Sequence, residues 1–435
     1  MYIINSPKSF KKVFAHPVWS LIAAFGTYFC MYGYRKPYTA ATYAAAAYWG
    51  LSYKFGLIIA QTTGYVLAKW IGIKFVSEIN PAKRIGAIIA LISFAELMLL
   101  LFALIQRPWN LVCMFLNGLP LGVIFGLVLG FVEGRKQAEF LVAGLCLSFI
   151  LSDGVSKSVG AFLLTFGVTE NWMPFVAGLV FLLPTLLFTV MLACIPQPSL
   201  TDISARSARD PMTAQDRRHF FNKYAPGLIC IIFIYLFVTL LRSVRADFAL
   251  ELWTGLGYKK SPELFTTSEL LVSLGVLMVT GLAVLIKNHY KAFRFSLLTS
   301  FIGFLILLVA VIGLYNGLGA FTFMVLIGLG VYLPYVAIHA VIFERLIAIT
   351  RERATVRFLM YVVDSVGYTS YIGLMLLRYF THTTESILSL FFKMCLFLAI
   401  AGMLLMLFCH LYFETKLKPY EQRNAILPAG ASCSV

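Results

Sequence analysis

Apolar runs of about 20 residues recur along the whole sequence, each ended by charged residues, proline or glycine. A helix of that length crosses the hydrocarbon core of a bilayer while satisfying its own backbone polar groups. The chain is 60% hydrophobic and only 12% charged, which excludes an ordinary soluble domain. We therefore predict an all-α polytopic membrane protein with twelve transmembrane helices, near residues 17–38, 53–77, 84–106, 109–132, 139–167, 173–195, 224–252, 264–286, 293–315, 318–348, 354–380 and 386–414.

The first apolar run is interpreted as a retained span rather than a signal peptide. It contains no small-residue cleavage site, and it ends in two cations, Arg35 and Lys36. Two cations at the far end of an apolar segment need an explanation, because hydrocarbon does not solvate them.

The positive charge is distributed by loop. Most lysines and arginines fall in alternate connections, whereas the opposite connections carry Arg107, Lys259, Lys260 and Arg378. Cytoplasmic loops of membrane proteins carry the excess of positive charge, so we expect both termini to be cytoplasmic in a bacterial inner membrane. The formal net charge of +16 is thereby explained by the bilayer, and we expect no nucleic-acid partner.

A polar stretch rich in Ser, Asp, Arg and Pro divides the chain in two. We predict a six-helix half over residues 1–196, a cytoplasmic linker over 197–223, a second six-helix half over 224–415 and a cytoplasmic tail over 416–435. Two patterns indicate a duplication. Glu133 and Glu344 are separated by the same 211 positions as Asp153 and Asp364, and the stripe Tyr28, Tyr32, Arg35 has the same spacing as Tyr235, Thr239, Arg242. Glycines at 122, 126 and 130 predict close helix packing.

Four cations lie within the expected spans: Arg35, Lys69, Lys157 and Arg242. Ionisable groups at this depth normally face a cavity or a partner and mark function. Arginine holds phosphate with a planar two-point fork and lysine adds a point charge, so these cations predict an anion site. Neutral donors for the same site are Tyr28, Tyr32, Tyr65 and Thr239.

Structural alternatives exist for most of these cations. Arg35 and Lys36 can extend to the outer interface, and Arg242 can pair with Asp247 or Glu251 on its own helix. Lys157 lies four residues after Asp153, which favours an ion pair within the helix.

Carboxylates in the spans are candidates for proton coupling. Asp364 is the best of them because no cation lies near it on its own helix; Asp153 and Glu269 follow, and His339 is less favoured. At the inner face, gate ion pairs are expected from Glu133, Arg135, Glu344 and Arg345. Glu96 has no obvious role.

Catalytic chemistry has no support in the sequence. The eight cysteines lie singly, seven of them within apolar runs, and the sequence offers no nucleophile–base pair, metal-ligand spacing or phosphate-binding glycine loop. We expect no enzyme, no cofactor and no bound metal.

Three short stretches resemble the major facilitator superfamily, and within it the organophosphate:phosphate antiporters. "YFCMYGYRKPY" is similar to the tyrosine-rich end of that family's first span at Arg35 and Lys36. "GYVLAKWIGIKFVSEINPAKR" places Lys69 on the second-span lysine, "FVTLLRSVRAD" places Arg242 on the seventh-span arginine, and Lys157 falls near the fifth-span histidine. The Tyr-Arg-Lys-Pro opening also resembles a poorly characterised bacterial branch of the superfamily.

The resemblance implies a monomeric carrier that moves a small anionic solute by alternating access, in exchange for phosphate. Arg35 and Arg242 would then clamp the anion from both halves. Two alternatives remain open at this point: a proton-coupled symporter or exporter of an organic anion that uses Asp364, and a membrane sensor that binds the ligand without moving it.

Overall fold

A computed structural model describes residues 13–43, 47–48, 51–132, 135, 137–197, 214–258, 261–352, 354–381 and 385–426. Within these residues the chain is almost entirely helical. The helices are α2 (Pro17–Met31), α3 (Tyr53–Glu78), α4 (Arg84–Leu104), α5 (Leu111–Val132), α6 (Ala138–Thr165), α7 (Met173–Ala193), α9 (Ala214–Asp247), α10 (Ala249–Gly255), α11 (Glu263–Leu285), α12 (His289–Tyr315), α13 (Ala320–Ala337), α14 (Phe343–Thr350), α15 (Val356–Phe380) and α16 (Ile387–Ile426). Two-residue strands β1 (Ala47–Tyr48) and β2 (Leu51–Ser52) pair between α2 and α3.

Ten segments of the described chain are long and apolar enough to cross a membrane. The prediction of an all-helical, polytopic membrane protein is confirmed at this level. The two expected spans outside the ten are those of α2 and α3. Helix α2 has 15 residues because the chain tightens into a 3₁₀ turn at Tyr32–Tyr34, and α3 carries the buried lysines Lys54 and Lys69.

Two helices extend beyond the expected boundaries. Helix α9 begins at Ala214, inside the expected linker, and its backbone leaves the helical region at Tyr224 (φ −118°, ψ 18°). Pro226 follows two residues later and kinks the helix, because its ring removes a backbone donor and crowds the preceding turn. Residues 198–213 of the expected linker lie outside the described chain. Helix α16 continues to Ile426, through much of the expected tail.

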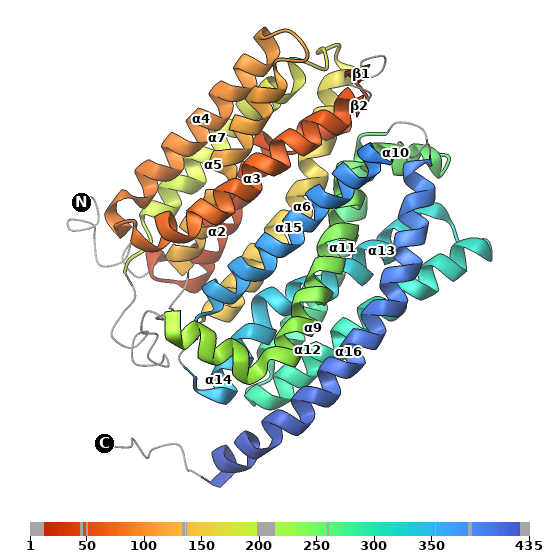
Figure 1. The fold of residues 1–435 in the computed structure, drawn as a ribbon. Coiled ribbons are helices and arrows are strands. Elements are labelled where there is room, and N and C mark those ends of the chain that lie inside the picture. The colour runs from red at the N-terminus through yellow and green to blue at the C-terminus, as the bar shows by residue number, and fades with distance from the viewer. Residues whose placement is uncertain are drawn as a thin grey trace.

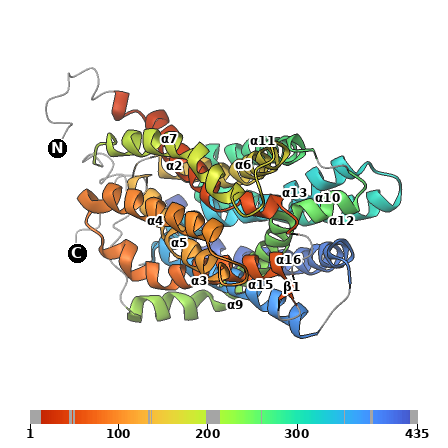
Figure 2. The ribbon, with the colours of Figure 1, turned by 90° about the horizontal axis from the view of Figure 1, so that it is seen from above.

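The helices form two groups. Helices α2–α7 pack on one another, and so do α9–α16; we call these the first and second groups. Figure 1 shows α3, α4, α5 and α7 at the upper left and α12, α13 and α16 at the lower right, with α6 and α15 between them. In the view of Figure 2, α3–α5 again lie apart from α12 and α16. The groups meet chiefly where α6 packs on α11 and α3 on α15.

Glycines allow the closest crossing inside the first group. A Cβ on Gly64 would lie 2.0 Å from the carbonyl oxygen of Phe115, and one on Gly118 would lie 2.1 Å from that of Gln61. Gly122, one of the glycines expected at a close contact, also lies at this crossing of α3 and α5. The two backbones therefore touch, and α3 is held firmly against α5.

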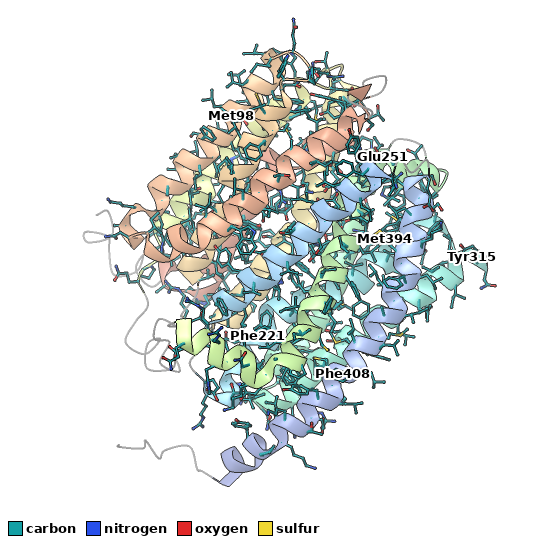
Figure 3. All side chains as sticks on the ribbon, in the orientation of Figure 1. Met98, Phe221, Glu251, Tyr315, Met394 and Phe408 are labelled. Atoms are coloured by element: carbon teal, nitrogen blue, oxygen red, sulfur yellow. The ribbon has the colours of Figure 1, made fainter. Side chains whose placement is uncertain are left out.

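Apolar side chains cover the outside of the molecule. Leu183, Leu285 and Phe380 are more than two-thirds exposed, and Phe408 and Tyr315 stand on the outer surface in Figure 3. Lipid tails can take up such side chains, so the exposed faces of α7, α11 and α16 fit a bilayer. Several charged side chains of the spans are instead buried, among them Arg35, Lys69 and Asp364.

Candidate functional site

A small cavity lies between the two helix groups. Its volume is about 10 Å³, space for about one water molecule. Its lining comes from both groups: Tyr32, Arg35, Lys36, Thr62, Phe149 and Asp153 from the first, and Arg242, Ser243, Ala246, Asp247, Tyr368 and Tyr371 from the second. Arg35 and Arg242, predicted from opposite halves of the sequence, are therefore brought to one place.

Arg35 is buried without an acidic partner. The 3₁₀ turn at Tyr32–Tyr34 ends α2 and directs Arg35 toward the interior, where it is 5% exposed. Its guanidinium carbon lies 3.8 Å from the centre of the Tyr65 ring. Among the described residues no carboxylate pairs with it, and its Nε has no hydrogen-bond partner there. The suggestion that Arg35 extends to the outer interface is wrong, and a cation–π contact replaces an ion pair.

Arg242 lies in a matching environment on α9. It is 7% exposed, its Nη2 donates a hydrogen bond of 2.7 Å to the hydroxyl of Tyr368, and its guanidinium carbon lies 4.6 Å from the centre of the Tyr335 ring. In the described part of the chain it pairs with no carboxylate, and its Nε is also without a partner. Asp247 and Glu251, the partners expected on its own helix, pair with lysines instead, and Glu251 lies on the separate helix α10.

Three lysines of the first group pair with carboxylates of the second. Lys36 pairs with Asp247, Lys54 with Glu251 at 2.6 Å, and Lys69 with Asp364 at 2.8 Å. Lys36 is 7% exposed, so the idea that it extends to the interface is wrong as well. A charge removed from water is stabilised by an adjacent opposite charge, so each pair favours contact between the groups; Glu251, with a side chain 31% exposed, is the least buried of the partners.

Two further ion pairs lie within one group. Lys157 pairs with Asp153 on α6, as the spacing of four residues favoured, and Arg245 pairs with Glu269 at 2.5 Å between α9 and α11. All three expected proton-coupling carboxylates thus have a basic partner. Lys54 and Arg245 were missed by sequence reasoning, although their charge inside an apolar segment was a usable signal.

The expected neutral donors are only partly brought together. Tyr32 lines the cavity, Tyr65 stacks under Arg35, and the ring centres of Tyr65 and Tyr368 lie 5.1 Å apart. Tyr28 and Thr239 do not line the cavity: Tyr28 packs on Tyr32 with ring centres 5.7 Å apart, and Thr239 packs against Gly367. Tyr335 and Tyr368 complete the aromatic enclosure from the second group and were not predicted.

The expected inner gate is described in part. Glu133 lies outside the described residues. The Arg135 Nε donates to the carbonyl oxygen of Phe131 at 3.1 Å, and Nη1 of Arg345 lies 2.9 Å from Nδ1 of His289. Glu344 is half-buried at the start of α14.

Within the described part of the chain, no group of three or more His, Cys, Asp or Glu side chains is arranged to hold a metal ion.

We expect the Lys36–Asp247 pair to behave as a buried ion pair. Asp247→Ala leaves an ammonium without a partner and should lower the free energy of unfolding by about 3 kcal/mol, whereas Lys36→Met with Asp247→Ala should recover most of that loss. Denaturant titration in mild detergent measures both. Glu385→Gln is the control, because its partner Lys393 has a side chain 72% exposed and the change should stay within about 0.5 kcal/mol. Equal effects of the single and double variants would contradict the pairing.

The fold and the site together define a polytopic helical membrane protein with a basic, tyrosine-lined cavity between two helix groups. The chain belongs to a family of unknown function, DUF5690, whose model matches residues 37–416. No curated protein matches the chain.

Proposed function

We propose that this protein is a secondary transporter of the major facilitator type that carries a small, doubly negative solute. A phosphate monoester is the solute class that we favour. The observation that carries the proposal is the pair Arg35 and Arg242: two buried guanidiniums, one from each helix group, on one cavity and without carboxylates among the described residues.

Charge balance supports a dianion. Around the cavity, Lys36 is balanced by Asp247 and Asp153 by Lys157, so the two arginines contribute an excess of two positive charges. A phosphate monoester carries a charge of about −1.5 to −2 near neutral pH and offers acceptor oxygens for both planar forks. Tyr368, which already accepts a hydrogen bond from Arg242, is placed to act as a neutral donor to the same anion.

The size of the cavity supports alternating access. A space of about 10 Å³ cannot contain a phosphate ester, so the two groups have to separate before such a solute enters. In our proposal α2 and α3 are the first two of twelve spans, and the two groups are pseudo-symmetric six-helix halves. The offset of 211 positions that relates Asp153 to Asp364 also separates Lys36 from Asp247, which meet across the cavity, as residues near a pseudo-two-fold axis do. We place the protein in a bacterial inner membrane with both termini in the cytoplasm, on the distribution of lysine and arginine among the loops.

Ligand stabilisation of the purified protein, followed by counterflow in proteoliposomes, tests the proposal. We expect glycerol phosphate to raise the melting temperature more than acetate does, and glycerol alone to have no effect, because only a dianion matches both arginines. Labelled phosphate should then exchange across the liposome membrane. Stabilisation without flux would favour a sensor, and the absence of both would refute an anion site.

A further inference from the structure

Asp364 lies in a buried cluster beside the anion cavity. Its Oδ2 accepts a hydrogen bond of 2.8 Å from Lys69 of the opposite group, and its Oδ1 accepts one from the hydroxyl of Tyr235. The side chains of Lys69 and Asp364 are 4% and 7% exposed. Asp364 is therefore the partner of a cation that leaves with the first group when the groups separate at this end of α3.

His339 is the second member of this cluster. It lies on a π-helical turn, Ile338–Ile342, a distortion found frequently at functional sites. Its Nδ1 is 3.1 Å from the carbonyl oxygen of Tyr335, which only accepts hydrogen bonds, so Nδ1 carries the proton.

The Nε2 of His339 is then an unprotonated base. It lies 3.4 Å from the hydroxyl of Tyr235 and 3.7 Å from Oδ1 of Asp364. Nε2 of His339 and Oδ1 of Asp364 are therefore two acceptors that face the one hydroxyl proton of Tyr235. A proton added between them would supply the hydrogen-bond donor that is missing.

We propose that Asp364 and His339 form a proton-binding site that fills when an anion draws Lys69 away, so that the protein moves a proton together with its anionic solute. This inference rests on the proposed transport function and names its coupling ion. It makes net transport a proton symport, and labelled solute still exchanges for unlabelled solute when both sides of the membrane contain it.

The site carries two excess positive charges when it is empty, from Arg35 and Arg242, and one when it is loaded. In the loaded state the two arginines and the ammonium of Lys69, which keeps its proton, face the dianion. One aqueous proton adds to the carboxylate of Asp364, where Nε2 of His339 accepts a hydrogen bond from it. Release on the other side reverses both events and restores the Lys69–Asp364 pair. One O–H bond forms and breaks, and nothing is oxidised or reduced.

Asp364 and His339 are the groups of this cluster that can accept a proton, as its described neighbours indicate. Lys69 faces it from α3, Cys146 from α6, Tyr235 and Arg242 from α9, Tyr335 from α13 and Tyr368 from α15. Lys69 and Arg242 are cations that resist a proton on His339 alone, whereas Asp364 attracts it. A proton shared between the two is therefore the arrangement that the charges favour.

Sulfate binding to the purified full-length protein tests the inference, because sulfate keeps the same charge across the range of histidine titration. Isothermal titration in two buffers of different ionisation enthalpy counts the protons. In the wild type we expect uptake of about one proton per sulfate and an affinity that rises up to about tenfold for each unit by which pH falls. His339→Gln leaves the Lys69–Asp364 pair in place and should reduce that uptake.

Two further variants complete the test. Asp364→Asn alone leaves Lys69 buried without a partner, so Lys69→Met with Asp364→Asn is made as well, and it should bind sulfate weakly and without pH dependence. His410→Gln is the control, since His410 lies 3.8 Å from Glu414 near the end of α16, and it should match the wild type. Binding without proton uptake in the wild type would overturn the coupling and leave the anion site intact. No sulfate binding in the wild type would contradict both.

Discussion

Replacing Arg35 or Arg242 with lysine is expected to lower the transport of glycerol phosphate roughly tenfold to a hundredfold. Lysine keeps the charge but loses the planar fork, and hydrogen bonds to charged groups contribute about 1.5–3 kcal/mol each. Each arginine also stacks on a tyrosine ring, Tyr65 or Tyr335, and an ammonium cannot reproduce that flat contact. Initial rates of uptake into proteoliposomes, at equal amounts of reconstituted protein, measure the effect.

Arg378→Lys is the matched control for both variants. Arg378 lies near the end of α15, donates to the carbonyl oxygen of Glu385 and does not line the cavity. Its replacement should leave transport within about a factor of two of the wild type, since surface changes usually alter free energies by less than about 0.5 kcal/mol. Wild-type transport by Arg35→Lys and Arg242→Lys would rule out the clamp.

Gly64→Ala and Gly118→Ala are expected to destabilise the protein by about 1–3 kcal/mol each. The new methyl group would meet a backbone carbonyl at 2.0 or 2.1 Å, and a backbone cannot move aside as a side chain can. Because α3 also carries Lys54 and Lys69, the displacement would shift both cross-group ion pairs. Melting temperature and the yield of monodisperse protein in detergent measure the outcome.

Gly86→Ala and Gly281→Ala introduce the same methyl group into open space, with no atom within 4 Å. Alanine has the higher helix propensity by about 1 kcal/mol, so these controls should be neutral or slightly stabilising. Four variants with the same stability would mean that α3 and α5 do not cross as closely as described.

The sequence was sufficient to predict an all-helical membrane protein, because each apolar run can be recognised from its own residues without knowledge of the rest of the fold. Runs of about 20 apolar residues predicted ten of the segments that can cross a membrane. The same reasoning is weakest at α2 and α3, the helices that carry much of the site. Helix α2 is short because of the turn at Tyr32–Tyr34, and α3 is less apolar because it carries buried polar residues, so the hydropathy signal is weak at both.

The sequence predicted most of the buried cations of the site, but of their acidic partners only Asp153, four residues before Lys157. Lys69 and Asp364 are separated by 295 positions and Lys54 and Glu251 by 197, so no periodicity along one helix links them. Asp247 and Glu251 are the carboxylates nearest to Arg242 in the sequence. In the structure they pair with Lys36 and Lys54 instead. The packing of the two groups decides which buried cations have no carboxylate partner. The sequence around each cation does not contain that information.

The three cross-group ion pairs are spread along the contact and not gathered at one level. Lys54 and Lys69 lie 15 residues apart on α3, which places them about 22 Å from each other along the helix axis. That distance covers most of the hydrocarbon thickness of a bilayer. In the proposed transport cycle, the protein opens at one face of the membrane by breaking the ion pair at that end of α3, while the pair at the other end serves as the pivot.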